Sequence, residues 1–491
     1  MVTTEEEADR PKCLDGTRFD LLQQIRSWAE SSDSPNIFLL TGDSGTGKST
    51  VARTIAEEFG QEERLGSYIY FEKGKTDSNT VVNSVIKTIA YGLAKKNPVI
   101  AKKIYATSTS NFELGFPSSH VMFENLVHIP LLEAAKKGVF KPSLIILDAL
   151  DECGPSHIQE ELAGLVGENI SKLPSLFRFL VTTRQESSLE SLLQAQIASN
   201  CKYYKLDRTS TSSRNDILKF VNHKMWELGK FQDFEIEDKT WKDIIGELGA
   251  GADGVFVWAS VAISYISNSY LNRPERLGAL VNDQATTNKS LSRLYEMILE
   301  KGSTWDDLKR ERFRSIFSLI LFGKRWITNP EIDVLLGLEI GTTHAFLPRV
   351  KRLIHHVSLY EYLVSSECVN KSWYIDEGEG RMKISLCCFE QMRKSLHFNI
   401  CELEKPFEIN EDVSQLQQYI EKDIPSSLQY VCQNWALHLQ DVPYSDELHN
   451  QLHYFAYNTL LYWAEVLSIT GYLHVCLGSA LRIAINWLGV S

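Results

Sequence analysis

Gly42-Asp43-Ser44-Gly45-Thr46-Gly47-Lys48-Ser49 is the stretch of sequence that decides the fold. It fits the pattern G-x-x-x-x-G-K-[S/T], in which glycines let backbone N–H groups surround a polyphosphate. The apolar run Ile37–Leu40 before it predicts a buried strand, and Thr50–Phe59 after it predicts a helix. A helix N-terminus behind such a turn adds a partial positive charge. Strand, glycine-rich turn and helix together predict a phosphate-binding loop.

The residues of this loop have separate predicted roles. The Lys48 ammonium would reach the outer phosphates of a nucleotide, and the Ser49 hydroxyl would hold Mg²⁺. The alternative, a Gly/Ser-rich turn before an ordinary helix, is disfavoured because both flanking elements fit the motif. The residues predicted to bind nucleotide here are Gly42, Asp43, Ser44, Gly45, Thr46, Gly47, Lys48, Ser49 and Thr50.

A second apolar run, Ser143–Asp148, ends in a carboxylate. Unbroken hydrophobicity is typical of a strand in a parallel sheet that is buried on both faces. Asp148, at the end of this strand, is predicted to hold Mg²⁺ through water, together with Ser49. Asp151 and Glu152 follow on the predicted loop, where a carboxylate can orient or deprotonate an attacking water. The pattern therefore predicts the two functions that nucleotide hydrolysis needs, binding of the metal ion and activation of the attacking water.

The run Phe177–Arg184 predicts another strand, with two hydroxyls and a guanidinium at its end. Arg184 is the third candidate catalytic residue, placed to contact the outer phosphate from a neighbouring strand. As an isolated residue, it would more often be a solvated surface arginine. Because ligands of open α/β sheets bind outside the carboxyl ends of the strands, all three strand ends are expected at one pocket.

Composition places the chain among soluble globular proteins. It has 491 residues and a net charge of −12, which argues mildly against nonspecific nucleic-acid binding and gives no clear nucleic-acid site. Nine scattered cysteines without C-x-x-C spacing, and an acidic N-terminus unlike a signal peptide, favour a reduced cytoplasmic setting. The most apolar stretch, 255–266, is shorter than the roughly twenty residues that a membrane span needs.

Strand and helix patterns alternate as far as residue 208 and then give way to helices. We expect an α/β P-loop NTPase fold, a parallel sheet with helices on both faces, followed by mostly α-helical domains. Asn329-Pro330 opens a predicted helix, and the β-like run Val350–Ile354 follows, which suggests a small winged-helix-like unit. The predicted domains are a tail and lead-in helix at 1–35, the NTPase domain at 36–208, a helical domain at 209–310, the winged-helix-like domain at 311–365, and a C-terminal helical domain at 366–491.

Taken together, these residues resemble the fungal NACHT proteins, signal-transduction NTPases of the STAND class that include NOD-like receptors. The loop and the acidic motif are shared by many NTPases, so the resemblance depends mainly on Ala149 and the Asp151-Glu152 pair. The segments that carry it are Cys13–Arg18 with Trp28, Gly42–Ser49, Leu147–Cys153, Val181–Arg184, Gly254–Ala259, and Leu428–Cys432 with Trp435.

The resemblance implies a switch between two nucleotide states. In such proteins ADP holds the domains closed, exchange for ATP opens them, and the opened molecules self-associate. A histidine of the winged helix contacts the β-phosphate of ADP, and the segment His356–Leu363 resembles the one that carries it. His356 is therefore the candidate, with His355 as an off-register rival and a merely packed histidine as the alternative. The sequence shows no recognisable effector domain and no ankyrin or WD40 array.

Three functions remain open from the sequence. The first is a NACHT-type switch that binds ATP/ADP or GTP/GDP with Mg²⁺ and hydrolyses the triphosphate slowly. The second is a small-molecule kinase or other metabolic NTPase, although no Arg-rich lid precedes the helical half. The third is a scaffold that keeps nucleotide without hydrolysing it. Neither the base nor the protein partners are encoded in a motif.

Overall fold

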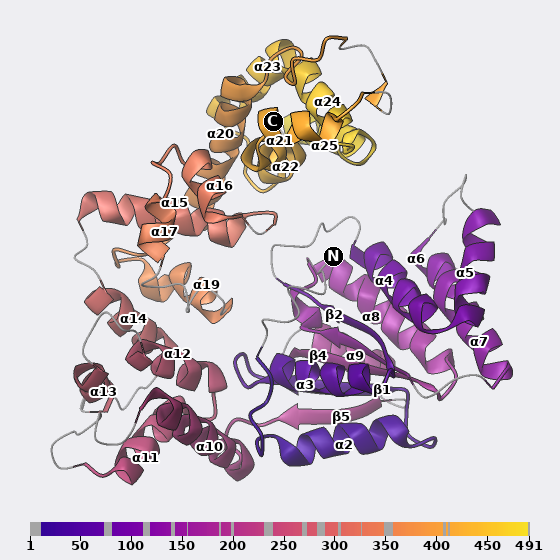
Figure 1. Cartoon of the computed structure of the whole chain (residues 1–491). Coiled ribbons are helices and arrows are strands. Elements are labelled where there is room, and N and C mark those ends of the chain that lie inside the picture. The colour runs from indigo at the N-terminus through magenta and orange to yellow at the C-terminus, as the bar shows by residue number, and fades with distance from the viewer. Residues whose placement is uncertain are drawn as a thin grey trace. The chain divides into compact units, whose positions relative to one another are not determined.

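The computed structural model divides into two compact units, Met1–Glu296 and Met297–Ser491 (Figure 1). Helix α14 (Leu291–Gly302) spans the division. The structure describes residues 11–72, 81–110, 118–138, 143–154, 156–185, 188–197, 201–229, 239–267, 273–281, 290–302, 306–325, 327–347, 357–405, 409–410 and 413–489. The predicted domain boundaries within these units stay predictions.

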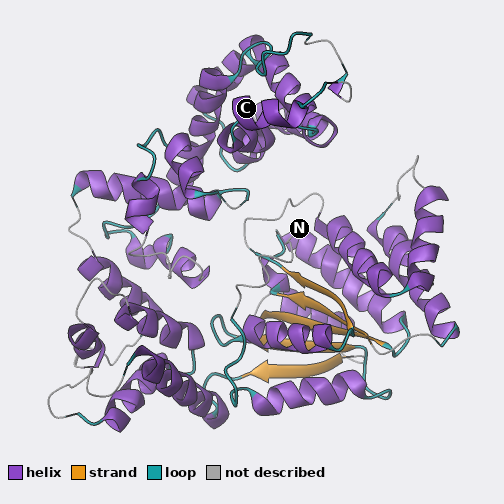
Figure 2. Ribbon diagram, in the orientation of Figure 1, coloured by secondary structure: helices purple, strands orange, loops and turns teal. Residues whose placement is uncertain are grey.

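A five-stranded parallel sheet forms the centre of the first unit (Figure 2). Its order is β2-β3-β4-β1-β5, so β4 lies between the loop-bearing β1 and the acidic β3. All three strands are buried, apart from Arg184 at the end of β4, which confirms the expectation drawn from their unbroken hydrophobicity. The strands are β1 (Ile37–Gly42), β2 (Leu65–Tyr70), β3 (Ser143–Asp148), β4 (Phe177–Arg184) and β5 (Cys201–Leu206).

Helices α2 (Phe19–Glu30) and α3 (Lys48–Gln61) cover one face of this sheet. Trp28 of α2 is buried, meets the Phe38 ring edge-on with 5.3 Å between centroids, and donates its indole N–H to the carbonyl of Pro35. Ile55 of α3 packs in the same cluster with the apolar residues of β1, β3 and β4. This packing fixes α3, and with it the end of the loop, against the sheet.

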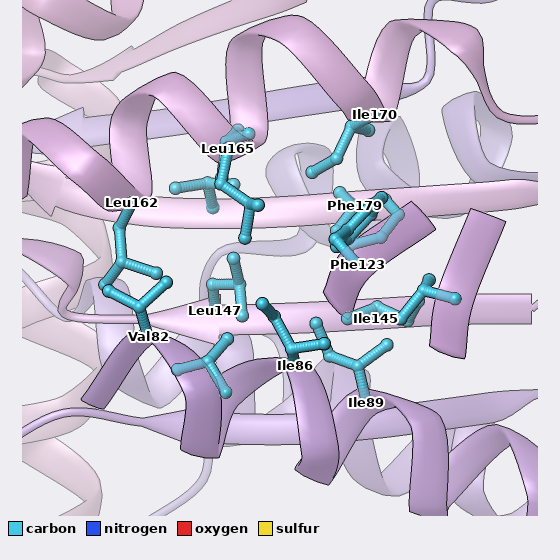
Figure 3. Packing of buried hydrophobic residues seen from close by; sticks show 14 of the residues in the cluster. Val82, Ile86, Ile89, Phe123, Ile145, Leu147, Leu162, Leu165, Ile170 and Phe179 are labelled. Carbon is cyan, nitrogen blue, oxygen red and sulfur yellow. The ribbon is translucent and has the colours of Figure 1, made fainter. Parts of the chain in front are cut away.

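The opposite face carries a larger helical layer (Figure 3). Val82, Ile86 and Ile89 of α4 and Leu162 and Leu165 of α8 pack against alternate residues of the strands. Side chains alternate between the two faces of a strand, so a sheet covered on both sides is apolar at every position. The helices between β2 and β3, and those after β3, are α4 (Val81–Lys96), α5 (Pro98–Ser110), α6 (Ser119–Phe123), a π-helical turn (Glu124–His128), α7 (Ile129–Lys136), α8 (Ser156–Asn169) and α9 (Ser188–Ile197).

Among the described residues, four helices follow β5 in the first unit before α14 begins. Ser210 caps the first of them by accepting a hydrogen bond from the Ser213 N–H, and Thr240 and Asp243 form a capping box on the second. These helices are α10 (Thr211–Leu228), α11 (Trp241–Ala252), α12 (Phe256–Ser267) and α13 (Arg273–Val281).

Within its described residues, the second unit is helical and has no strand. A helix begins at Asn329 as predicted, because Thr328 and Glu331 form a capping box with Pro330 in the first turn. The helices are α15 (Asp307–Phe322), α16 (Asn329–Leu335), α17 (Thr342–Phe346), α19 (Val357–Leu363), α20 (Glu377–Ser395), α21 (Leu416–Asp423), α22 (Ser426–Gln440), α23 (Asp446–Asn458), α24 (Leu460–Ile469) and α25 (Leu473–Gly489). The β-like run at 350–354 lies outside the described residues, and so does His356 with its rival His355.

In the described part of the chain, no helix is both long and apolar enough to cross a membrane. The stretch expected to be a buried helix is α12, whose Trp258, Val261 and Ile266 lie in the interior. This agrees with the length argument made from the sequence.

Candidate nucleotide-binding site

The predicted phosphate-binding loop connects β1 to α3 at the carboxyl end of the sheet. Gly45 and Gly47 adopt φ of +76° and +97°, in the left-handed region that favours glycine. Gly42 is constrained by space instead, because a Cβ there would lie 2.9 Å from both the Cβ and the carbonyl oxygen of Leu206. Asp43, Ser44 and Thr46 lie on the turn, while Ser49 and Thr50 lie in the first turn of α3.

Lys48 is the first residue of α3 and is almost fully buried. Its ammonium Nζ donates to the carbonyl oxygens of Gly42 at 2.7 Å and Asp43 at 2.9 Å, so the loop closes on its own lysine. Burial lowers the pKa of Lys48, and the carboxylate of Asp151 opposes that shift more than any other group does. The ammonium is therefore buried near charged side chains, and in the described structure its hydrogen-bond acceptors are two neutral carbonyls.

Asp148 ends β3 and is fully buried. Its Oδ1 accepts hydrogen bonds from Ser49 Oγ at 3.0 Å and Thr182 Oγ1 at 2.6 Å, and its Oδ2 accepts one from the Tyr68 hydroxyl at 3.3 Å. Thr182 comes from β4, Tyr68 from β2 and Ser49 from α3, so two neighbouring strands and one helix orient the carboxylate. Neither Thr182 nor Tyr68 had been predicted to contact Asp148; the only available signal was the pair of hydroxyls at the end of β4.

The Ser49–Asp148 pair suits Mg²⁺ in its chemistry. Mg²⁺ takes oxygen ligands, and protein sites usually supply one or two side chains and leave the remaining positions to water and substrate phosphates. A hydroxyl and a carboxylate lie 3.0 Å apart, next to the loop that would hold those phosphates. The donor set therefore fits the predicted metal.

Asp151 and Glu152 lie on a short 3₁₀ turn, Leu150–Glu152, rather than on an irregular loop. Ala149 enters this turn with a φ of +57°, and its N–H donates to Thr182 Oγ1 at 2.8 Å. A left-handed non-glycine residue costs about 1–2 kcal/mol, so this bond to β4 helps to hold the turn in place. The chain direction after β3 is thereby fixed by the neighbouring strand.

Arg184 of β4 joins both of these carboxylates. Its backbone N–H donates to Asp151 Oδ1 at 3.1 Å and its Nε lies 3.0 Å from Asp151 Oδ2, while its Nη2 lies 3.1 Å from Glu152 Oε1. The two carboxylate side chains are about nine-tenths buried, and Arg184 is about one-quarter exposed. The structure thus brings Lys48, Ser49, Asp148, Asp151, Glu152 and Arg184 together at one edge of the sheet.

The helical part of the first unit contacts the loop directly, which no local pattern had predicted. The Val257 N–H donates to the Gly45 carbonyl at 3.2 Å, and a Cβ on Gly45 would lie 3.0 Å from side-chain atoms of Val255 and Val257. Gly254 makes this approach possible, because its φ is +81° and a Cβ there would lie 2.0 Å from the Arg208 carbonyl oxygen. The segment Gly254–Val257 therefore packs against the side of the loop on which the Gly45 carbonyl lies, here called the outer side.

A half-open pocket of about 610 Å³ lies between the residues that lead into α2 and the N-terminal half of α10. Polar and apolar atoms line it in similar measure. The lining residues are Gly16, Phe19, Asp20, Ser212, Asn215, Asp216 and Lys219.

Residues 16–184 match the family model described as nephrocystin 3, N-terminal, a range that contains every site residue above from the loop to Arg184. No curated protein matches the sequence significantly. The similar solved structures include a Walker-type ATPase of Pyrococcus abyssi, with 16% identity over 70% of this chain and 92% of that one and a TM-score of 0.33. They also include a Signal Transduction ATPase with Numerous Domains (STAND) with a tetratricopeptide repeat sensor from Pyrococcus horikoshii, with 12% identity over 98% of this chain and 65% of that one and a TM-score of 0.45. A third is Cdc6p of Pyrobaculum aerophilum, with 11% identity over 80% of this chain and 99% of that one and a TM-score of 0.32. Such low identities and TM-scores say nothing about ligand or activity.

The predicted fold is confirmed by the architecture itself. A parallel sheet has helices on both faces, the glycine-rich loop follows β1, an acidic residue ends β3, and helical domains follow. This is the α/β fold of P-loop NTPases.

Proposed function

We propose that this chain is a nucleotide-dependent switch of the NACHT type within the STAND class. It binds ATP or GTP with Mg²⁺, hydrolyses the triphosphate slowly, and couples the bound state to opening and self-association. The observation that carries the proposal is the gathering of Lys48, Ser49, Asp148 and Arg184 at the carboxyl edge of one sheet. The family resemblance noted in the sequence supplies the signalling role.

Phosphate binding would exchange the partners of Lys48. Its ammonium is held by two neutral carbonyl oxygens, at 2.7 and 2.9 Å. A phosphate oxygen carries negative charge, and a charge-assisted hydrogen bond is roughly twice as strong as a neutral one. The lysine would therefore leave the loop carbonyls for the outer phosphates, while loop N–H groups and the N-terminus of α3 bind the same anion.

Ser49 and Asp148 would hold Mg²⁺, which neutralises charge on the phosphates when it is bound. Asp151 or Glu152 would orient a water toward the terminal phosphorus and accept its proton, as the bond to the leaving phosphate oxygen breaks. Arg184, which pairs with both carboxylates, would contact the terminal phosphate. His356 is proposed, from the resemblance alone, to contact the β-phosphate of the diphosphate.

The contact of Gly254–Val257 with the loop supports a switch over an ordinary hydrolase. A ligand can shift a conformational equilibrium only through contacts that differ between the two states. Here a segment of the helical part touches the loop that would bind the phosphates. Loop occupancy and the helical part therefore have a direct physical link.

The first experiment identifies the nucleotide that the purified protein carries. The protein is denatured and the released nucleotide is separated by chromatography, and recovery of ADP or GDP supports the closed state of the switch and identifies the base. Binding of ATP and GTP is then titrated for wild type, Lys48→Ala, and a control Lys202→Ala on β5, whose ammonium lies over the Phe38 ring. Binding is expected to be lost only in Lys48→Ala; equal binding by all three proteins would reject the proposal.

One observation favours a second candidate, a scaffold that binds nucleotide without turnover. Arg184 is paired with both Asp151 and Glu152, so both proposed catalytic carboxylates already have a cationic partner. Phosphate release is therefore compared between wild type and an Asp151→Ala, Glu152→Ala double variant. Equal release rates, with nucleotide binding retained, would favour the scaffold. Phosphate transfer to a small molecule in a substrate screen would instead favour a kinase.

A further inference from the structure

Two carbonyl groups on the outer side of the phosphate-binding loop have specific donors. The Gly45 carbonyl accepts from the Val257 N–H at 3.2 Å, and the Thr46 carbonyl accepts from Arg18 Nη2 at 3.0 Å. Within a trans, planar peptide unit, the C=O and the N–H point in opposite directions. A donor that holds the Thr46 carbonyl on the outer side therefore directs the Gly47 N–H toward the inner side, where a phosphate would lie.

Arg18 is itself held on several sides. Its Nη1 donates to Ser213 Oγ of α10 at 2.8 Å, and its guanidinium carbon lies 5.0 Å from the centre of the Phe256 ring of α12. Its backbone N–H donates to Asp216 Oδ2 at 3.1 Å. The side chain is only 6% exposed. The guanidinium therefore has a fixed position between the loop and the helical part.

We propose that Arg18 is a positioning residue for phosphate binding: it orients the Thr46–Gly47 peptide and ties that peptide to α10 and α12. This inference rests on the proposed nucleotide binding at the loop. Arg18 would not contact the ligand itself. It acts through the backbone of the loop, so its effect is on any polyphosphate, whatever the attached base.

The three contacts of the Arg18 side chain suit a guanidinium group better than any other cation. One N–H arm bonds to the Thr46 carbonyl and another to Ser213 Oγ, while the flat face of the group lies over the Phe256 ring. Arginine presents such donors in a rigid plane and stacks on aromatic rings, whereas a lysine ammonium is a single point with a flexible stem. Lysine at position 18 would keep the charge and lose one of the two connections.

The test measures the affinity of full-length protein for Mg-ATP, Mg-GTP and inorganic tripolyphosphate by calorimetry. The variants are Arg18→Ala, Arg18→Lys and Ser213→Ala. Arg26→Ala is the matched control, because Arg26 lies in α2, the helix that follows Arg18, and pairs with Glu58 of α3 away from the loop. Circular dichroism and thermal melting establish that each variant is folded. Guanidinium chloride at low millimolar concentration is added to Arg18→Ala as a chemical rescue.

We expect Arg18→Ala to weaken nucleotide and tripolyphosphate alike, by about tenfold or more, as loss of a charged hydrogen bond to the loop would. Arg18→Lys and Ser213→Ala should lose less, guanidinium should restore part of the affinity, and Arg26→Ala should match wild type. If Arg18→Ala does not fold, Arg18→Lys and Ser213→Ala provide the same comparison.

Two outcomes would overturn the inference without touching the proposed function. Unchanged affinity in the folded Arg18 variants would remove Arg18 from phosphate binding. Weakened nucleotide binding with unchanged tripolyphosphate binding would mean that Arg18 acts on the nucleoside and not on the loop. By contrast, failure of wild type to bind either nucleotide or tripolyphosphate would reject the proposed function itself.

Discussion

The two units each bury a network of charged and polar side chains, and the networks differ in what their partners are. At the sheet edge of the first unit, Lys48 bonds to carbonyls of its own loop and Arg184 to carboxylates of the next turn. In the second unit, Tyr430 of α22 accepts a hydrogen bond from the Lys324 N–H and lies 2.7 Å from His438 Nε2. The Lys324 ammonium in turn lies 2.6 Å from Asp441.

The difference lies in what a ligand could replace. A phosphate is a better partner for Lys48 than a neutral carbonyl, so the first network can exchange partners on binding. The second network links Lys324, in the turn after α15, to residues near both ends of α22. Its hydrogen bonds join one part of the fold to another, and we see no reason for a ligand to replace them. We therefore expect the first network to govern ligand affinity and turnover, and the second to govern stability.

Turnover should show the largest effect. In Arg184→Gln, the cationic group between Asp151 and Glu152 is lost, and with it the proposed contact to the terminal phosphate. Phosphate release is expected to slow by about a hundredfold, the usual cost of removing one donor to a developing charge. Arg214→Gln, an exposed arginine on α10 near Asp253, serves as the control. Full turnover in Arg184→Gln would place Arg184 among residues of structural importance only.

Metal dependence should show the next largest effect. Asn at position 148 keeps one oxygen for Ser49 and Thr182 but removes the charge that Mg²⁺ would need. Asp148→Asn is expected to weaken nucleotide binding with Mg²⁺ by about ten- to a hundredfold and metal-free binding much less. Titrations with Mg²⁺ and with EDTA measure the two affinities. An equal change in both would make the acidic strand end purely structural.

Stability, by contrast, should respond in the second unit. Tyr430→Phe leaves the Lys324 N–H and His438 Nε2 without the hydroxyl that joins them. Loss of such a buried partner costs about 1–3 kcal/mol in free energy of unfolding. Urea unfolding followed by circular dichroism measures the loss, and nucleotide affinity should match that of wild type. A drop in affinity of the folded variant would contradict the division of roles between the two networks.

The smallest effect, per pH unit, should be on the free energy of unfolding at acidic pH, through His438 of the same network. Burial, reinforced by Lys324 and Arg381, lowers the pKa of His438 well below its ordinary value. Below about pH 6.5 the unfolded chain binds a proton that the folded chain does not, so the free energy of unfolding falls as pH falls, by about 1.4 kcal/mol per unit. His438→Gln should remove that one-proton slope, as measured by urea unfolding at several pH values. An unchanged slope would show that His438 protonates in the folded state.

Much of the site could be predicted because its signals are local. Gly42–Ser49 specifies a backbone turn, and the apolar runs before Asp148 and Arg184 specify buried strands, each within fewer than ten residues. The parallel arrangement follows from that burial, and the common edge follows from the parallel arrangement. The assignment of catalytic roles to Asp151, Glu152 and Arg184 stays a prediction, since position alone does not show turnover.

The remaining contacts could not be predicted because they join distant parts of the chain. Arg18 meets Asp216 across 198 positions, and Val257 meets Gly45 across more than two hundred. Side-chain partners at such separations depend on how helices pack, and no periodicity encodes them. The pairing of Arg184 with both carboxylates depends likewise on β4 lying beside β3, where the backbone turn after Asp148 brings them within reach.

Position 254 leaves no room for a residue other than glycine. Any side chain there would lie 2.0 Å from the Arg208 carbonyl oxygen, whereas Gly246, eight positions earlier on α11, has open space around it. The two glycines therefore differ strongly in their tolerance of substitution, although they lie in the same helical region. Alanine at 246 should be tolerated or even favourable, while alanine at 254 should push the covering segment away from the loop.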